Sequence, residues 1–202
     1  MKLTVICANS RKDSESLKVA KWFKGAIGND GQTVNLIDLH VSQLPLELDK
    51  LWDEDPDTML IWNPIKDALT AAEAYVVVTP EWNGMANPSF FNLVDYTDGE
   101  MAYKPALLVG VSASRGGAYP IAQIKGFASK NTHIDFIPEH VLIRDVEKVF
   151  NKFEPEEESK YGDAYLKDRS KYALKVLYEY AKALKGLRDS GVIDHKTYPN
   201  GM

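Results

Sequence analysis

Short apolar runs alternate with helix-like segments along most of this chain. The runs cover residues 3–8, 33–39, 74–79, 105–111 and 134–143, and Pro138 could interrupt the last of them. Around the runs, apolar side chains recur at the 3.6-residue spacing of amphipathic helices. Five such alternations without an internal repeat predict an α/β fold, a single doubly wound five-stranded parallel sheet with helices on both faces.

One stretch does not follow this alternation. Residues 40–63 contain Pro45, Pro56, several leucines and two tryptophans. We expect a loop there with at most one short helix, and its apolar side chains are candidates for a subunit contact. Pro64 suits the first turn of the helix that follows.

The C-terminal part begins with an acidic connector over residues 148–160 and a long amphipathic pattern over 162–187. We therefore predict one domain over residues 1–188. Residues 189–202 are expected to form a loose tail.

Charge and cysteine content narrow the class of protein. The 202 residues carry a net charge of -5 and no block of basic residues, which argues against a nucleic-acid partner. Cys7 is the one cysteine, so no intramolecular disulfide can form. The apolar start of the chain is too short for a signal peptide, and no run approaches the length of a membrane span. We expect a reduced, soluble, cytoplasmic protein without a membrane contact.

Polar loops follow three of the predicted strands, at residues 9–16, 79–84 and 112–117. Right-handed crossovers place the carboxyl ends of parallel strands on one edge of the sheet, where open α/β folds bind their ligands. Taken alone, residues 79–84 (Thr-Pro-Glu-Trp-Asn-Gly) fit a simple strand-to-helix turn equally well. The convergence of three polar loops favours a ligand site.

The first loop has the features of an anion site. It opens a helix, whose free N–H groups and positive end attract phosphate. Its side chains add amide, hydroxyl and guanidinium donors, from Asn9, Ser10, Arg11, Ser14 and Ser16. An ordinary helix start, capped by Ser14 or Ser16 with Arg11 in solvent, explains the same residues.

The other two loops suit a planar ligand. Trp82 offers a flat face, and Gly84, Gly116 and Gly117 let the backbone approach a ring closely. A phosphate site beside a ring site describes flavin mononucleotide (FMN) better than a sugar phosphate or a nucleoside triphosphate. No Walker loop, dinucleotide fingerprint or marker of a magnesium site is present.

The order of these motifs resembles the NAD(P)H-dependent FMN reductases, a flavodoxin-like family that includes quinone, chromate and azo-dye reductases. Ala8–Ser16 resembles the family's Gly-Ser-x-Arg-x-x-Ser-x-Asn loop and keeps its arginine at Arg11. Pro80–Asn83 resembles the Pro-Glu-Tyr-Asn motif. Lys104–Gly117 resembles a Lys-Pro strand that ends in a serine- and glycine-rich loop.

The resemblance implies a strand order of 2-1-3-4-5 and an FMN site built by the three loops. Asn9, Arg11 and Ser16 would hold the phosphate, with Ser14 beside them. The ribityl chain and the ring would be lined by Pro80, Trp82, Asn83 and Gly84, and the other edge of the ring by Ser112, Ser114, Gly116 and Gly117. Glu81 is expected in the same site, orienting loop backbone rather than acting as a base.

In such enzymes the flavin carries the chemistry. Hydride passes from NAD(P)H to flavin N5 and then to a quinone or similar small acceptor, or to free flavin. The resemblance therefore implies no catalytic side chain and no metal. It also implies a homodimer or homotetramer, because enzymes of this kind usually pair their subunits.

Two other functions stay open. A flavodoxin-type electron carrier would bind FMN without using nicotinamide, although residues 9–16 lack the Thr/Ser-x-Thr-Gly-x-Thr pattern of flavodoxins. A cofactor-free regulatory relative is suggested by departures from the family pattern. Ala8 and Asn9 replace glycine and serine, Ser16 replaces asparagine, and Phe91 stands where lysine is usual.

Overall fold

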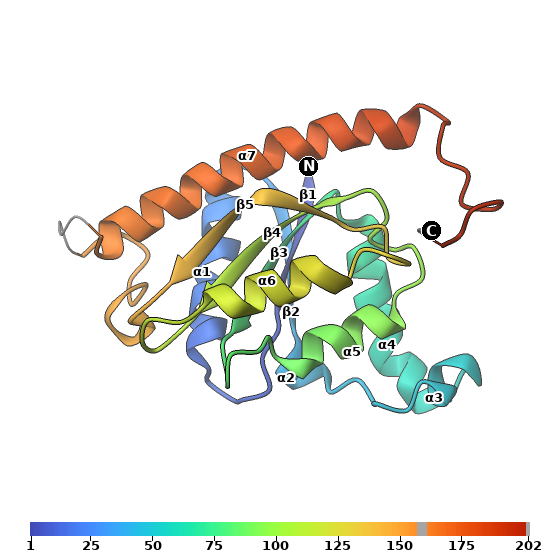
Figure 1. Ribbon diagram of the computed structural model, residues 1–202, viewed down its shortest axis with the longest axis horizontal. Coiled ribbons are helices and arrows are strands. Elements are labelled where there is room, and N and C mark those ends of the chain that lie inside the picture. The colour runs from blue at the N-terminus through green and yellow to red at the C-terminus, as the bar shows by residue number, and fades with distance from the viewer. Residues whose placement is uncertain (157–160, 201–202) are drawn as a thin grey trace.

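A five-stranded, all-parallel sheet forms the centre of the molecule in the computed structural model, which describes residues 1–156 and 161–200 (Figure 1). The strand order is β2-β1-β3-β4-β5, as predicted. The strands are β1 (Lys2–Cys7), β2 (Thr33–Asp38), β3 (Ala74–Pro80), β4 (Pro105–Val111) and β5 (Asp135–Ile143). Residues 157–160 of the predicted connector and 201–202 of the predicted tail lie outside the described residues.

Helices cover both faces of the sheet and enclose two apolar cores (Figure 1). One face carries α1 (Glu15–Asn29) and the long α7 (Asp163–Asp189). The other face carries the larger helices α4 (Pro56–Ala71), α5 (Pro88–Tyr96) and α6 (Ala118–Phe127). The short helices are α2 (Leu39–Ser42), α3 (Asp49–Trp52) and the 3-10 turn η1 (Val146–Lys148).

The central strands show why the sequence forms a sheet buried on both sides. Val76 and Val78 of β3 pack into the core under α1 and α7, whereas Tyr75 and Val77 pack into the opposite core. All four side chains have no exposed surface. A parallel sheet covered on both faces needs such a continuous apolar run, rather than the alternation of a half-exposed strand.

The prediction for residues 40–63 is wrong, because this region is largely helical. Helix α4 begins at Pro56, eight residues before the predicted start, and Pro64 lies inside it. Asp55 caps the helix by accepting a hydrogen bond from the Thr58 N–H at 2.9 Å, and Pro56 takes the first helical position. An aspartate followed by proline is a strong helix start, and it outweighs the one backbone hydrogen bond that Pro64 removes.

Strand β5 passes Pro138 without ending. Its register against β4 shifts there, because Ala106 pairs with Phe136 whereas Leu108 pairs with His140. The strand lies at the edge of the sheet, where a residue without an N–H and an irregular register are tolerated. The potential interruption is therefore an irregularity within one strand.

The described part of the C-terminal tail folds back on the body of the molecule instead of hanging loose. The His195 ring packs against Tyr103 and His133, with centroids 5.3 and 4.7 Å apart. His133 Nε2 also lies 3.1 Å from the Pro199 carbonyl oxygen. The division into a domain of residues 1–188 and a tail stays a prediction. In the described ranges, no helix combines the length and apolar content that crossing a bilayer requires.

Candidate functional site

The three predicted loops meet at the carboxyl edge of the sheet and form one cleft of about 280 Å³. Small-molecule sites typically span roughly 300–1,000 Å³, so the volume of this cleft lies just below that range. The segment after β5 supplies a fourth wall. The cleft is lined by Asn9, Ser10, Arg11, Ser14, Glu15, Ser16, Pro80, Glu81, Trp82, Asn87, Val111, Ser112, Ala113, Val146 and Glu147.

The start of α1 forms the end of the cleft that suits an anion. Ser14 caps this helix, and its Oγ accepts a hydrogen bond from the Leu17 N–H at 3.1 Å. The first turn leaves backbone N–H groups without helical partners, and they carry the positive end of the helix dipole. Ser10 Oγ accepts a hydrogen bond from Asn87 Nδ2 at 3.1 Å, which leaves the Ser10 hydroxyl hydrogen available to a ligand.

Asn9 lines the cleft, but its side chain forms hydrogen bonds within the protein. Its amide donates to Cys7 Sγ at 3.1 Å and to Asp38 Oδ1 at 2.8 Å, and its Oδ1 accepts from the Arg11 N–H at 3.0 Å. Both amide hydrogens are therefore engaged, and neither is available to a phosphate. Burial and, to a lesser extent, Asp38 raise the pKa of Cys7 to about 12, so this thiol stays protonated and unreactive.

The Arg11 guanidinium lies over the Trp82 ring, and both side chains line the cleft. The guanidinium carbon lies 5.0 Å from the centroid of the indole, within the range of a cation–π contact. Trp82 keeps 47% of its surface exposed and so leaves part of the ring free for a planar ligand.

Asn83 and Gly84 lie outside the cleft, at the tip of a tight turn. Trp82 and Met85 exchange backbone hydrogen bonds of 3.2 and 2.9 Å across it. The φ angles of Asn83 and Gly84 are +51° and +71°. Asparagine and glycine are the residues that adopt this left-handed pair most readily, so their contribution is to place Trp82.

Glu81 joins the second loop to the third. Its carboxylate accepts a hydrogen bond from the Gly117 N–H, which confirms the expectation that Glu81 orients loop backbone. A Cβ on Gly116 would lie 2.7 Å from Glu81 Oε1, and one on Gly110 would lie 2.0 Å from the Gly117 carbonyl oxygen. Gly110 is therefore required by a backbone contact, whereas a side chain at position 116 would displace the Glu81 carboxylate; the sequence did not reveal either contact.

The third loop is closed by Ser112. Its Oγ accepts hydrogen bonds from the Ser114 and Gly116 N–H groups, at 3.1 and 3.2 Å. Ser112 lines the cleft, whereas Ser114, Gly116 and Gly117 are not among the lining residues. Of the thirteen predicted residues, eight line the cleft: Asn9, Arg11, Ser14, Ser16, Pro80, Glu81, Trp82 and Ser112.

Sequence reasoning missed Asn87, Val146 and Glu147 as lining residues. Asn87 caps α5, and its side chain also ties that helix to Ser10. Val146 and Glu147 follow β5, and the rule that ligands bind at the carboxyl ends of parallel strands could have found them. In the described part of the chain, no group of three or more His, Cys, Asp or Glu side chains could hold a metal ion.

The lining carries one guanidinium, of Arg11, and three carboxylates, of Glu15, Glu81 and Glu147. Glu15 pairs with Lys18 at 2.5 Å, and Glu81 is bonded to the Gly117 N–H. Arg11 faces the cleft with its positive charge. The anion end therefore combines a helix N-terminus, a hydroxyl and a guanidinium, which is a donor set suited to a phosphate.

Comparison with known proteins gives a consistent result. A model of the family described as NADPH-dependent FMN reductase matches residues 1–147. The NADPH azoreductase of Bacillus sp. (strain OY1-2) is 25% identical over 144 residues, which are 71% of this chain and 76% of that protein.

Solved structures share the fold at lower identity. FerB, a flavoenzyme NAD(P)H:(acceptor) oxidoreductase from Paracoccus denitrificans, superposes with a TM-score of 0.63 at 20% identity, over 91% of this chain and 97% of that one. An azoreductase from Bacillus anthracis str. Sterne superposes with a TM-score of 0.53 at 15% identity, over 91% and 98% of the two chains.

Proposed function

This chain belongs to the NADPH-dependent FMN reductase family, and from that premise we propose that it passes electrons from NAD(P)H through FMN to a quinone or a similar small acceptor. The cofactor FMN, the donor NAD(P)H and flavin-dependent oxidoreduction follow from the family. The acceptor and the residues that bind FMN are our proposal. The observation that carries the proposal is one cleft with an anion site at the start of α1 and a half-exposed indole opposite.

The residues that line the cleft fit FMN, with one group placed to hold the phosphate and another to line the ribityl chain and the ring. The first turn of α1, Ser10, Ser16 and Arg11 would hold the phosphate, with Ser14 fixing the start of the helix. Pro80, Trp82 and Ser112 would line the ribityl chain and the ring. Because the cleft is small, the ring would lie toward the open rim beside Trp82 rather than deep between the loops.

The remaining predicted residues would act through the shape of the loops. Asn9 would hold the first loop against Asp38, and the Asn83-Gly84 turn would hold Trp82 in place. Glu81 and its partner Gly117 would keep the second and third loops together. The residues that shape the loops without adding donors are Asn9, Glu81, Asn83, Gly84, Ser114, Gly116 and Gly117.

When bound, FMN supplies the redox chemistry by accepting hydride from NAD(P)H and returning electrons to the acceptor. The protein then has to bind, orient and shield. Arg11 and the start of α1 neutralise the phosphate, and Trp82 offers its ring to a planar group. The proposal requires no side chain to act as acid, base or nucleophile.

Exposed apolar side chains near the rim favour a shallow site for a planar acceptor and a contact with a second subunit. Trp82, Met85 and Tyr119 are 47%, 47% and 69% exposed. Val41, Leu46, Trp52 and Leu60, on the region from α2 to α4, are at least 74% exposed. Exposed apolar side chains that gather in one patch mark protein contacts, and together with the family resemblance these residues lead us to propose a homodimer or homotetramer.

The test begins with the visible absorbance spectrum of the purified protein, followed by titration of the apoprotein with FMN. A bound flavin and oxidation of NADPH on addition of a water-soluble quinone are the expected results. Reduction of an azo dye but of no quinone would correct the acceptor. A flavin that stays oxidised when mixed with NADPH in a stopped-flow instrument would identify an electron carrier, and failure to bind FMN would identify a cofactor-free relative.

A further inference from the structure

An ion pair lies completely buried at the start of α7, outside the cleft. The side chains of Lys167 and Asp163 are 0% and 2% exposed, and Lys167 Nζ lies 2.5 Å from Asp163 Oδ2. The pairs farther along the same helix are exposed, for example Lys182 with Glu179. Removing two charges from water is expensive, and an apolar pair of similar volume is often as stable. The buried pair therefore calls for a role that apolar side chains could not fill.

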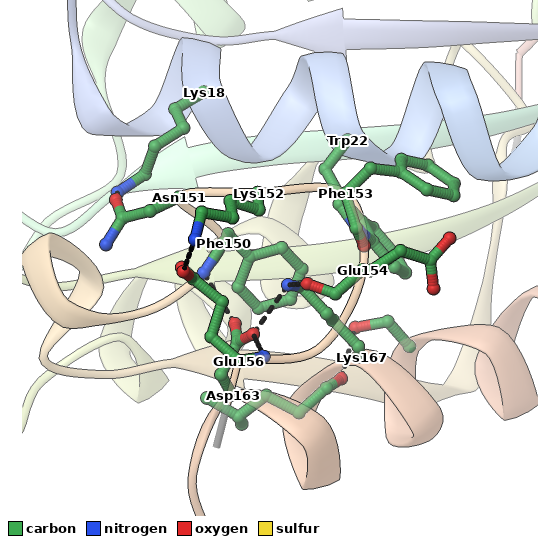
Figure 2. A network of polar contacts seen from close by, with 12 residues as sticks. Lys18, Trp22, Phe150, Asn151, Lys152, Phe153, Glu154, Glu156, Asp163 and Lys167 are labelled. Carbon is green, nitrogen blue, oxygen red and sulfur yellow. Dashed lines mark hydrogen bonds and ion pairs between the residues drawn. The ribbon is translucent and has the colours of Figure 1, made fainter.

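That role is visible in the segment that wraps around the pair, residues 149–156, which we name the clamp loop (Figure 2). Asp163 accepts hydrogen bonds from the Phe150 N–H at 2.7 Å and the Glu156 N–H at 3.0 Å. Lys167 Nζ donates to the Glu154 carbonyl oxygen at 2.8 Å. The clamp loop has no helix or strand to pair its backbone groups. A carboxylate beside an ammonium satisfies two donors and one acceptor at once, which apolar side chains cannot do.

The clamp loop also lies against α1 (Figure 2). Trp22 Nε1 donates to the Phe153 carbonyl oxygen at 3.0 Å, and the two rings stack with centroids 5.9 Å apart. A Cβ on Gly25 would lie 3.0 Å from the Phe153 ring, so the glycine permits this close approach. The pair on α7 is thereby connected to the face of α1.

Lys18 extends this connection to the cleft. Its Nζ donates to Asn151 Oδ1 of the clamp loop at 2.8 Å and to the Val146 carbonyl oxygen at 2.7 Å. Val146 and Glu147 form the fourth wall of the cleft, and Lys18 lies in the first turn of α1, whose start is the anion end. One continuous set of contacts therefore runs from α7 through the clamp loop to this wall.

We propose that Asp163 and Lys167 are positioning residues for the cleft. By fixing the clamp loop, the pair sets the Val146–Glu147 wall against the start of α1 without touching a ligand. The inference rests on the proposed FMN site, because it concerns how firmly that site is held. It assigns to the buried ion pair a role in ligand retention in addition to its contribution to stability.

The test uses a double variant, D163N/K167M, which carries no unpaired buried charge. The amide oxygen introduced by D163N can still accept one backbone N–H, whereas the other N–H and the Glu154 carbonyl oxygen lose their partner, so the apoprotein should melt several degrees below the wild type. FMN affinity is expected to fall roughly tenfold, a typical size for coupling through a packed network. Hydrogen exchange should accelerate at the clamp loop, at residues 146–147 and in the first turn of α1. The single variant K167M, which leaves Asp163 uncompensated, should lose both affinity and stability.

The matched control is K182M, the same substitution in an exposed pair of the same helix, and it should keep wild-type affinity and exchange. Unchanged FMN affinity in the double variant, with a wild type that binds FMN, would overturn the inference alone. If the wild type binds no FMN, the proposed function fails instead. The exchange measurement then still decides, because unchanged protection at residues 146–147 and at the start of α1 would refute positioning.

Discussion

The two ends of the sheet are built from the same parallel strands, but the polar groups of their loops are bonded in different ways. At the amino end, a side chain satisfies the backbone groups that follow the helices. Lys104 Nζ donates hydrogen bonds to the carbonyl oxygens of Leu69, Thr70 and Glu100, at 3.1, 2.8 and 2.7 Å. At the carboxyl end, the polar loops bond mainly to one another and leave a cleft between them. Saturated polar groups stabilise a fold, whereas a site must keep some donors available for its ligand.

This contrast predicts that substitutions at the amino end change stability alone, and that substitutions at the carboxyl end change ligand binding alone. We expect the largest effect from K104M at the amino end. It removes a cation that binds the last turn of α4, together with its three charge-assisted hydrogen bonds, which should cost about 2–3 kcal/mol of unfolding free energy. Urea unfolding of the apoprotein measures the loss. A changed FMN affinity in K104M would contradict the prediction that substitutions at the amino end change stability alone.

Lys104 also predicts a pH dependence. Burial, assisted by Arg188, lowers its pKa to about 8. Between about pH 8 and the ordinary lysine pKa of about 10.4, the unfolded chain holds a proton that the native protein has released, so the unfolding free energy should rise with pH. Burial raises the pKa of Tyr75 and Tyr178 in the native protein. Above about pH 10 the unfolded chain therefore loses these protons first, and the unfolding free energy should fall with pH. Urea unfolding between these limits should give a positive slope that K104M lacks, and an equal slope in both proteins would contradict the assignment.

The second largest effect is expected at the carboxyl end, from W82A. Loss of an aromatic surface that stacks on a planar ring typically costs about 1–3 kcal/mol, so FMN affinity should fall roughly 10- to 100-fold. Because Trp82 is half exposed, unfolding free energy should change little. Quenching of FMN fluorescence on titration measures the affinity, and W82F is the matched control that keeps a ring. Equal affinity in W82A would show that the ring binds elsewhere.

The contrast between the two ends also explains how far the sequence could predict the structure. The buried strands were predictable, because a sheet covered on both faces needs runs such as Ala74–Val78. Their order was implied by the family resemblance. The carboxyl-edge cleft followed from topology. The start of helix α4 was missed because Pro64 also suits a first helical turn, whereas Asp55 and Pro56 supply the stronger signal.

Within the site, the residue types were easier to predict than their tasks. Gly116 and Gly117 were predicted to allow a ligand's close approach, and the structure shows that both also lie against the Glu81 carboxylate. Asn9 was predicted to be a phosphate donor, but its amide is bonded to Cys7 and Asp38. The contacts of Asn9 with Asp38 and of Gly117 with Glu81 join residues 29 and 36 positions apart, and a single sequence does not encode such contacts locally.

A third, smaller effect is expected from E81Q, which tests the link between two loops of the cleft. The glutamine keeps the size of the side chain but replaces a charged acceptor by a neutral one, which weakens the bond from the Gly117 N–H by about 1 kcal/mol. FMN affinity should fall roughly fivefold, with faster release in a dilution experiment. E81D, which keeps the charge but is too short to reach Gly117, should behave like E81Q or worse. Wild-type affinity in E81D would mean that the third loop holds its shape without this bond.

The smallest effect is expected from substitutions of Asn83. They test whether this residue contacts the ligand directly or only shapes the turn that carries Trp82. Asn83 lies outside the cleft with φ at +51°, a region that costs most residues about 1–2 kcal/mol but that glycine adopts freely. N83L should therefore weaken FMN binding roughly twofold, since strain in the turn reaches Trp82 only in part. N83G keeps the turn and removes the side chain, so it should bind FMN like the wild type. Equal losses in the two variants would make Asn83 a direct ligand contact and would move the ring site out to the turn.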